Sequence, residues 1–321
     1  MRALVLCLVA LPCPALSEDL RLAVPLDCVL GETCHIQQGV DHDPGPGASD
    51  FRCGPQSYDG HTGTDFGLPT LAAQAAGVDV LAAAEGVVTA VRDGMPDLLQ
   101  GAPGAPDVTG RACGNGVVVD HGKGWETQYC HMADGSVAVR TGDRVRTGDV
   151  LGRVGLSGNT EFPHMHLSVR KDGAEVDPFE PDGVIVCGAP SEATLWVEDV
   201  VFPEGALVEV GFALEMPTLD ALWAGGAGVE EAGPDTPALV GWGLVWSGRA
   251  GDVVTIRIDG PGGEVIAHDE VLARTQAQLF RAAGKRRPEG GWPAGTYRAR
   301  ITLMRDGVSL GSRETVLEVV P

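Results

Sequence analysis

The chain has 321 residues, which is enough for two ordinary domains that each bury a hydrophobic core. Its 44 acidic side chains against 23 Lys and Arg give a formal net charge of -21 at pH 7. Such a surface repels nucleic acid and anionic lipid, so we expect no nucleic-acid partner. The acidity itself is explained by solubility.

The first 20 residues, MRALVLCLVALPCPALSEDL, are typical of a secretory signal. One basic residue precedes an apolar run, and the Ala-Leu-Ser ending at Ser17 is the small-x-small pattern that signal peptidases cut. Two prolines interrupt the run before it reaches the roughly 20 apolar residues of a membrane span. We therefore expect residues 1–17 to be removed, leaving a periplasmic or secreted protein that does not insert into a membrane.

Six cysteines would remain after this cleavage, an even number that fits disulfides in an oxidising compartment. They are Cys28, Cys34, Cys53, Cys113, Cys130 and Cys187. The segment CGNGVVVDHGKGWETQYC indicates two strands around a turn near 122–124, which would bring Cys113 close to Cys130. The other pairings cannot be deduced from spacing, and the absence of any Cys-x2-Cys disfavours a zinc-cysteine cluster.

Short β-branched runs punctuated by Gly, Pro and Asp recur along the chain and predict a mainly β protein. The segment PTLAAQAAG, at 69–77, is the best candidate for a short helix. A Gly-, Pro- and Asp-rich stretch at 93–110 predicts a long loop, and a linker follows Cys187. Residues 190–321 continue as strands and turns, which is compatible with a small β-sandwich.

The segment EFPHMHLSV places two histidines one residue apart in a strand-like run. Successive strand side chains alternate between faces, so His164 and His166 point the same way with Cα atoms roughly 7 Å apart. His61 and Asp65, four residues apart, could join them if the chain bends at Gly63. A further candidate, His131, follows a strand.

Histidine nitrogens with a carboxylate oxygen suit zinc, and a catalytic site keeps one position open for water. Zinc lowers the pKa of that water to about 7 and polarises a substrate carbonyl, while neighbouring imidazoles can move protons and stabilise an oxyanion. Five candidates exceed the needs of such a site, so we expect three to bind metal and two to handle protons. Strand geometry alone leaves open which does which.

Taken together, three elements resemble the lysostaphin-like (LytM-type) zinc metallopeptidases, which cut peptide cross-links of bacterial peptidoglycan. HTGTDF is similar to the family's His-x3-Asp element, and NGVVVDHGKGWETQYCHM is similar to its central hairpin ending in a catalytic histidine. The Gly-Asp-x-Val, Gly-x-x-Gly and His-x-His series follows, up to Val-x-Pro. The resemblance covers roughly residues 57–180.

The resemblance implies a β-sheet peptidase domain of duplicated, hybrid-like β fold and assigns the roles that spacing left open. His61, Asp65 and His166 would bind one zinc ion per chain, and His131 and His164 would be the catalytic pair. All five positions are filled, which favours an active zinc metalloendopeptidase acting on peptidoglycan stem peptides. The alternative is a noncatalytic cell-wall-binding regulator of other wall hydrolases, since degenerate family members act in that way.

The residue patterns and the resemblance together divide the chain into a signal peptide (1–17), an N-terminal extension (18–56), a metallopeptidase domain (57–186) and a C-terminal β-sandwich-like domain (190–321). We hypothesise that the last of these docks a protein partner or the cell wall, or positions the catalytic domain. The sequence leaves open whether the N-terminal extension covers the active site.

For five further positions the sequence predicts roles outside the catalytic set. Phe162 departs from the family pattern, which has a small residue before Pro163, and we expect this change to affect substrate choice alone. His121, in the hairpin turn, is expected to be solvated. His35 and His42 have no ligand-spaced partners and are expected to be structural, as is His268.

Overall fold

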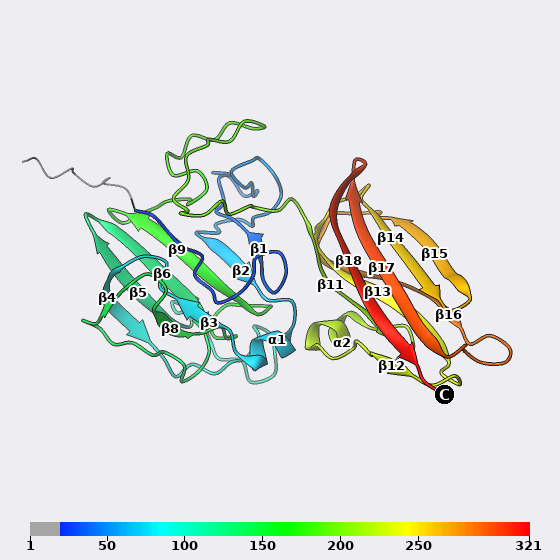
Figure 1. Cartoon of the computed structure of the whole chain (residues 1–321). Helices are drawn as coiled ribbons and strands as arrows, with labels where there is room; N and C mark the ends of the chain where they lie inside the picture. The colour runs from blue at the N-terminus through cyan, green and yellow to red at the C-terminus, as the bar shows by residue number, and fades with distance from the viewer. Residues whose placement is uncertain (1–19) are drawn as a thin grey trace, which may run out of the picture.

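The computed structural model describes residues 20–321, and the expected signal sequence lies outside them. Within this range the chain is mainly β, as predicted, with two short helices, α1 (Leu71–Ala76) and α2 (Leu219–Ala224). Figure 1 shows two β-rich halves side by side, one with β1 to β10 and the other with β11 to β18. No helix in the described range is long and apolar enough to cross a membrane.

The N-terminal half is built on an eight-stranded antiparallel sheet with the order β1-β2-β9-β6-β5-β4-β7, in which β10 pairs with β9. Its strands are β1 (His35–Gln38), β2 (Thr64–Gly67), β4 (Gly86–Arg92), β5 (Asn115–Gly122), β6 (Trp125–Met132), β7 (Arg144–Val145), β9 (His164–Lys171) and β10 (Ala174–Glu175). A separate ribbon pairs β3 (Asp79–Leu81) with β8 (Val150–Arg153).

The core of this half extends beyond the segment that resembles a peptidase. Leu22 and Phe51 from the N-terminal segment and Trp196 and Phe202 from the segment after β10 belong to the same apolar cluster as the sheet residues. A disulfide between Cys53 and Cys187 also joins these two segments. We therefore propose that the domain boundary lies near residue 205, where the C-terminal strands begin, rather than near 190.

The C-terminal half consists of two packed sheets. Strands β11 (Ala206–Ala213), β13 (Ala238–Gly248) and β16 (Gln276–Arg286) form one sheet. The other contains β12 (Glu231–Ala232), β18 (Val308–Val319), β17 (Gly295–Arg305), β14 (Val253–Gly260) and β15 (Gly263–Val271), in that order. Residues of both sheets share one apolar cluster, as expected of a β-sandwich.

Strand β13 is buried on both of its faces, which is unusual for an antiparallel sheet with one face toward its own core. Leu239 and Val245 point into the sandwich. Trp242 and Trp246, on the opposite face, belong to a second cluster that contains α2 and, from the N-terminal half, Phe162. The outer face of the three-stranded sheet is therefore covered partly by the other half of the molecule.

The hairpin of β5 and β6 has the predicted form, and Cys113 and Cys130 are joined across it by a disulfide. The third pair, Cys28 and Cys34, closes a short loop in the N-terminal segment. The expectation for His121 in the hairpin turn is wrong. This half-buried ring bonds to the Glu85 carbonyl oxygen at 2.7 Å and to Thr127 Oγ1 at 2.8 Å, because His121 belongs to β5 and lies beside the residues that precede β4.

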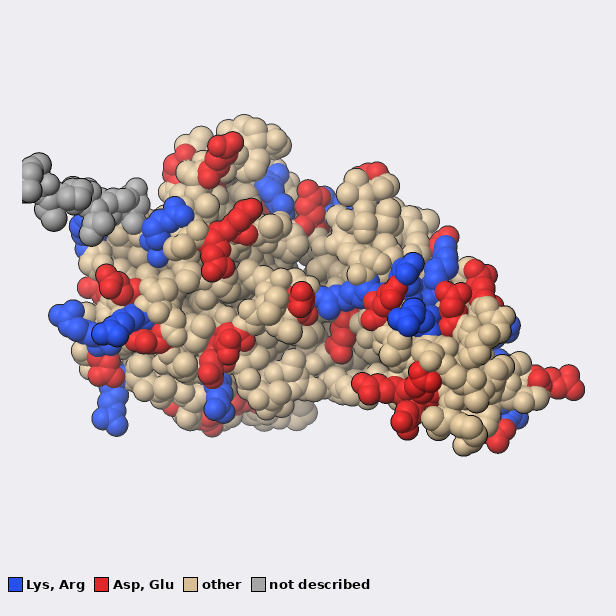
Figure 2. All heavy atoms as spheres, in the orientation of Figure 1, with Lys and Arg blue, Asp and Glu red and all other residues tan. Residues whose placement is uncertain are grey.

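Acidic side chains lie on both halves of the face seen in Figure 2, with Lys and Arg side chains among them. This mixed but mainly acidic distribution agrees with the net charge of -21.

Candidate metal centre

Strands β2 and β9 bring two of the predicted ligands together. In their antiparallel register Asp65 lies opposite His166, and Gly67 lies opposite His164. Directly opposed residues of an antiparallel pair project from the same face, so this register places one carboxylate and two imidazoles on that face. The predicted strand at His164 and His166 is confirmed.

His61 reaches the same place because the chain bends before β2. The bend falls at Gly63, as predicted, and β2 begins at the next residue. A Cβ atom at Gly63 would lie 2.4 Å from the Leu167 carbonyl oxygen and 2.6 Å from His166 Nε2. Only glycine therefore allows this turn to pack against β9 closely enough for His61 to join the cluster.

The three side chains present their donor atoms to a common point. His61 Nε2 lies 3.1 Å from His166 Nδ1 and 3.2 Å from Asp65 Oδ1, and His166 Nδ1 lies 2.9 Å from the same carboxylate oxygen. One ligand atom from each residue falls within 4.8 Å of the others, and all three residues are buried. This donor set of two imidazole nitrogens and a carboxylate oxygen fits a zinc ion.

The outer nitrogen of each histidine in this cluster has a protein partner. His61 Nδ1 donates to the Gly39 carbonyl oxygen at 2.6 Å, which leaves Nε2 as the atom with a free electron pair. His166 Nε2 lies 3.0 Å from Ser168 Oγ. A ligating histidine typically uses its second ring N–H in this way, and that contact sets its tautomer and orientation.

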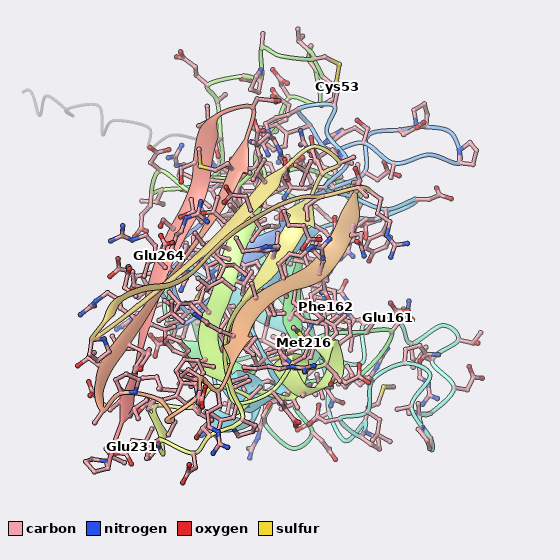
Figure 3. The ribbon with its side chains drawn as sticks, turned by 90° about the vertical axis from the view of Figure 1, so that its right-hand side faces the viewer. Cys53, Glu161, Phe162, Met216, Glu231 and Glu264 are labelled. Atoms are coloured by element: carbon pink, nitrogen blue, oxygen red, sulfur yellow. A yellow bond between two sulfur atoms is a disulfide. The ribbon has the colours of Figure 1, made fainter. Side chains whose placement is uncertain are left out.

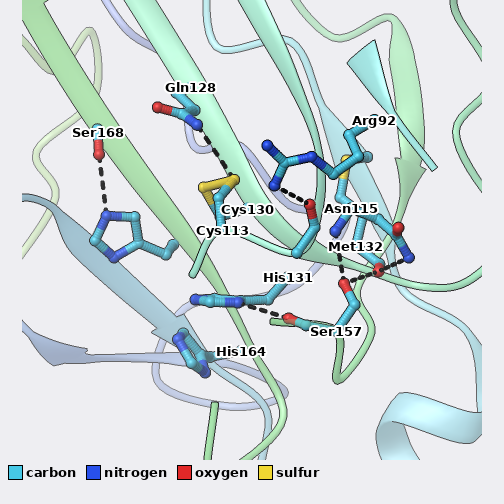
Figure 4. The surroundings of a disulfide bond; sticks show 12 residues. Arg92, Cys113, Asn115, Gln128, Cys130, His131, Met132, Ser157, His164 and Ser168 are labelled. Carbon is cyan, nitrogen blue, oxygen red and sulfur yellow. Dashed lines mark hydrogen bonds between the residues drawn. A yellow bond between two sulfur atoms is a disulfide. The ribbon is translucent and has the colours of Figure 1, made fainter. Parts of the chain in front are cut away.

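His131 and His164, whose rings lie close together in Figure 4, flank the cluster. Their ring centroids are 4.6 Å apart, and His164 Nε2 lies 3.6 Å from Asp65 Oδ1. His131 Nδ1 donates to the Ser157 carbonyl oxygen at 2.8 Å, and His164 Nδ1 donates to that of Phe162 at 2.9 Å. Each ring therefore keeps its Nε2 as a proton acceptor.

The backbone of His131 is strained. Its φ of 63° lies in the left-handed region, which costs a non-glycine residue about 1–3 kcal/mol and persists only where the surroundings enforce it. Here the amide of His131 donates to the Cys113 carbonyl oxygen at 2.9 Å, next to the disulfide of Cys113 with Cys130. The hairpin and its disulfide thus hold this side chain in place.

Burial and mutual charge set the protonation of the site. Burial of Asp65 disfavours its anion, yet electrostatic attraction to nearby His61 and His164 and hydrogen bonds from His166 and His61 outweigh this and hold the pKa of the carboxyl well below its usual range. Burial, followed by the nearby His164 and His166, lowers the pKa of His131 well below the ordinary value. Burial also lowers the pKa of His164. The flanking pair is therefore neutral near pH 7.

A cavity of about 280 Å³ opens over the cluster. Its lining includes the predicted residues His61, His131 and His166, and also Tyr58, Asn159 and Arg170. The sequence analysis missed these last three residues and the supporting Ser157 and Ser168. The position of Ser168, two residues after His166 on the same strand face, is the one signal that could have pointed to it.

An antiparallel sheet that buries a His-Asp-His cluster beside two further histidines is the arrangement expected of a metallopeptidase-type domain. Residues 59–178 match Peptidase family M23. This match over part of the chain confirms the resemblance to the LytM-type peptidases.

Two curated relatives share this region. The DD-carboxypeptidase/endopeptidase Mpg of Neisseria meningitidis is 34% identical over 118 residues, 37% of this chain and 22% of the relative. The peptidoglycan DD-endopeptidase ShyA of Vibrio cholerae is 30% identical over 135 residues, 41% of this chain and 25% of the relative. The matched part thus spans a quarter or less of the length of these relatives.

Among solved structures, a putative peptidase M23 from Pseudomonas aeruginosa is 28% identical, with 51% of this chain and 50% of that chain covered and a TM-score of 0.30.

Proposed function

We propose that this chain is a zinc metalloendopeptidase that hydrolyses peptide cross-links of bacterial peptidoglycan in the periplasm or outside the cell. The observation that carries the proposal is the convergence of five buried side chains, three of which present metal donors while two keep neutral imidazoles beside them. The names of the two curated relatives support the substrate class, and the three disulfides support an oxidising compartment.

In this proposal His61, Asp65 and His166 hold one zinc ion. When bound, zinc supplies a Lewis acid that makes water nucleophilic near neutral pH and polarises a scissile carbonyl. Asp65 remains ionised and offers the negative charge that favours a divalent cation. The Gly39 carbonyl and Ser168 fix the two imidazole rings so that their free nitrogens point toward the Asp65 carboxylate, where they would hold the ion.

His131 and His164 are the proposed catalytic pair. Because both rings are neutral and donate Nδ1–H to carbonyl oxygens, each offers Nε2 to the reaction as a base that can accept a proton from attacking water. A ring that has taken up this proton becomes a donor, so it can stabilise an oxyanion or return the proton to the leaving amine.

Cross-linked peptidoglycan is the direct test. The protein with residues 1–17 removed is incubated with it, with and without a zinc chelator, beside His131→Ala, and the released fragments are separated by mass. We expect cross-linked dimers to disappear only when both zinc and His131 are present. Their mass would identify the bond that is cleaved.

Zinc content supplies an independent check, with one ion per chain in the wild type and in His131→Ala and a loss of bound zinc in His166→Ala. A folded, zinc-loaded protein that cleaves nothing would contradict the enzyme proposal. Retained binding to the cell wall would then favour the noncatalytic regulator.

A further inference from the structure

Phe162 forms a contact between a proposed catalytic side chain and the C-terminal half. Its ring stacks on that of His164, with centroids 4.2 Å apart and an interplanar angle of 22°. Its carbonyl oxygen accepts the hydrogen bond from His164 Nδ1 at 2.9 Å, and it also accepts one from Thr160 Oγ1 at 2.7 Å. Both the ring and the backbone of Phe162 therefore help to determine where His164 lies.

Trp246, on β13 of the C-terminal half, packs edge-on against Phe162. The two ring centroids are 5.5 Å apart with an interplanar angle of 81°, which is a favourable geometry for an aromatic pair. Phe162 is labelled in Figure 3, which views the molecule from the side of the C-terminal half. Trp246 is only 2% exposed, so the indole side of this aromatic contact is shielded from water.

Trp246 packs against a row of paired residues on β1, β2 and β9 that ends at His164. His35 on β1 lies opposite Gly67 on β2, which in turn lies opposite His164 on β9. A Cβ atom at Gly67 would lie 2.4 Å from Trp246 Cζ3, and the His35 ring centroid lies 3.7 Å from that of Trp246. The glycine thus leaves the space that the indole occupies.

We propose that Trp246 is a positioning residue for the peptidase reaction, acting through Phe162 to hold His164 in its working orientation. The inference rests on the proposed function for the role of His164, but the contacts themselves do not depend on it. A side chain of the C-terminal half thereby completes the support of a site whose reacting groups all come from the N-terminal half.

The arrangement explains why this chain has an aromatic residue where a small one would leave His164 uncovered. Thr160 and the Phe162 carbonyl fix the Nδ1 edge of His164, but they do not restrain the face of the ring. Phe162 covers that face, and Trp246 limits the movement of Phe162. Removal of the indole would therefore leave the hydrogen bond in place and allow the ring to shift, and a misplacement of about 1 Å can cost roughly a hundredfold in rate.

The test compares Trp246→Leu with Trp242→Leu in the full-length mature protein. Trp242 is a matched control because it lies on the same face of β13, is equally buried at 2% exposed, and packs over Gly211 within the C-terminal half. We expect kcat on a cross-linked stem-peptide dimer to fall about tenfold or more in Trp246→Leu, with KM and zinc content unchanged. In Trp242→Leu kcat should stay within about twofold of the wild type.

Two further variants sharpen this test. Trp246→Phe keeps an aromatic edge and should restore most of the lost kcat. Phe162→Ala should lower kcat about as much as Trp246→Leu, and the double variant should add little, because both act through one contact. Equal losses in Trp242→Leu and Trp246→Leu, or additive losses in the double variant, would overturn the proposal.

A second readout does not need activity. In protein labelled with ¹³C-histidine, the ring signals of His164 are identified by their loss in His164→Gln. They should move in Trp246→Leu and stay in place in Trp242→Leu. Unmoved His164 signals in Trp246→Leu would refute the positioning role. If the signals move in Trp246→Leu but the wild type cleaves no peptidoglycan, only the proposed function is refuted.

Discussion

At the scale of single residues, Ser168 is the group that orients the proposed ligand His166. Its hydroxyl is the partner of the outer ring nitrogen, and the residue is 2% exposed. We expect Ser168→Ala to weaken zinc binding about tenfold, because loss of such an outer partner typically costs 10- to 100-fold in metal affinity. Competition with a fluorescent chelator measures this change.

Ser168→Thr is the control for this prediction, since it keeps a hydroxyl at the same position. It should retain most of the affinity. An alanine variant that binds zinc as tightly as the wild type would mean that the contact with Ser168 does not orient His166.

The buried ring of His35 predicts a separate dependence of the free energy of unfolding on pH. Burial of its ring, followed by the charge of Arg313, lowers the pKa of His35 to about 3, and its Nε2 has no hydrogen-bond partner. In the unfolded chain the pKa is about 6.5, so below that pH the unfolded state takes up a proton that the folded state does not. This contribution to stability is complete above pH 6.5 and is lost as the pH falls toward 3.

Between pH 7.5 and pH 5 the His35 contribution to the free energy of unfolding should fall by about 2 kcal/mol. His35→Phe keeps a ring against Trp246 and cannot titrate, so its stability should depend less on pH by that amount. Urea unfolding of both proteins at the two pH values measures the difference. Parallel pH dependences would show that His35 does not carry this effect.

At the scale of elements, the disulfide of the β5–β6 hairpin supports the strained backbone of His131. The bond joins residues 17 apart in sequence, for which loop entropy predicts about 3 kcal/mol of stabilisation. We expect Cys113→Ser with Cys130→Ser to lower the free energy of unfolding by about this amount. Peptidoglycan cleavage should fall as well, because His131 N is bonded to the Cys113 carbonyl oxygen.

The pair Cys28 and Cys34 provides the matched control. It closes a loop of six residues in the N-terminal segment, and neither cysteine lines the cavity. Replacing both with serine should cost about 2 kcal/mol of stability and leave cleavage by the folded protein unchanged. Cleavage lost equally in both double variants would mean that the hairpin disulfide has no particular effect on the site.

Local patterns in the sequence predicted the elements that carry the site. The alternation around His164 and His166, the turn near 122–124 and the glycine at the bend before Asp65 are each encoded within a few residues. The order of strands in the sheet brings Asp65 opposite His166, and that pairing joins positions about 100 residues apart. The resemblance to a family, rather than periodicity, supplied that part of the prediction.

The contacts of Phe162 and Trp246 could not be predicted in the same way. At position 162 the sequence shows a departure from the family pattern, which by itself indicates only a change in substrate choice. The sequence analysis did not single out the run ALVGWGLVW around Trp246, which forms a strand that is buried on both faces. Such contacts depend on how two separately folded sheets meet, for which a single sequence contains no local signal.

At the scale of the whole molecule, the two halves share an apolar interface in addition to the chain connection. The cluster with Trp242, Trp246 and Phe162 is continuous with α2, and Arg313 of β18 donates a hydrogen bond across to the carbonyl oxygen of Gly31. An interface of this kind couples the unfolding of the halves. We therefore expect the wild type to unfold in a single calorimetric transition.

Gly67→Ala should weaken this coupling without replacing any of the proposed reacting residues. The added Cβ would lie 2.4 and 2.7 Å from two atoms of the Trp246 indole, so the indole must move out of its space on the sheet. We expect the single transition to separate into two, or to broaden markedly, because the halves would then unfold more independently. Gly233→Ala is the control, since its Cβ would meet nothing within 4 Å. If Gly67→Ala unfolds as sharply as Gly233→Ala, the indole does not couple the two halves, and the C-terminal sandwich contributes to the molecule only through the other contacts of the interface.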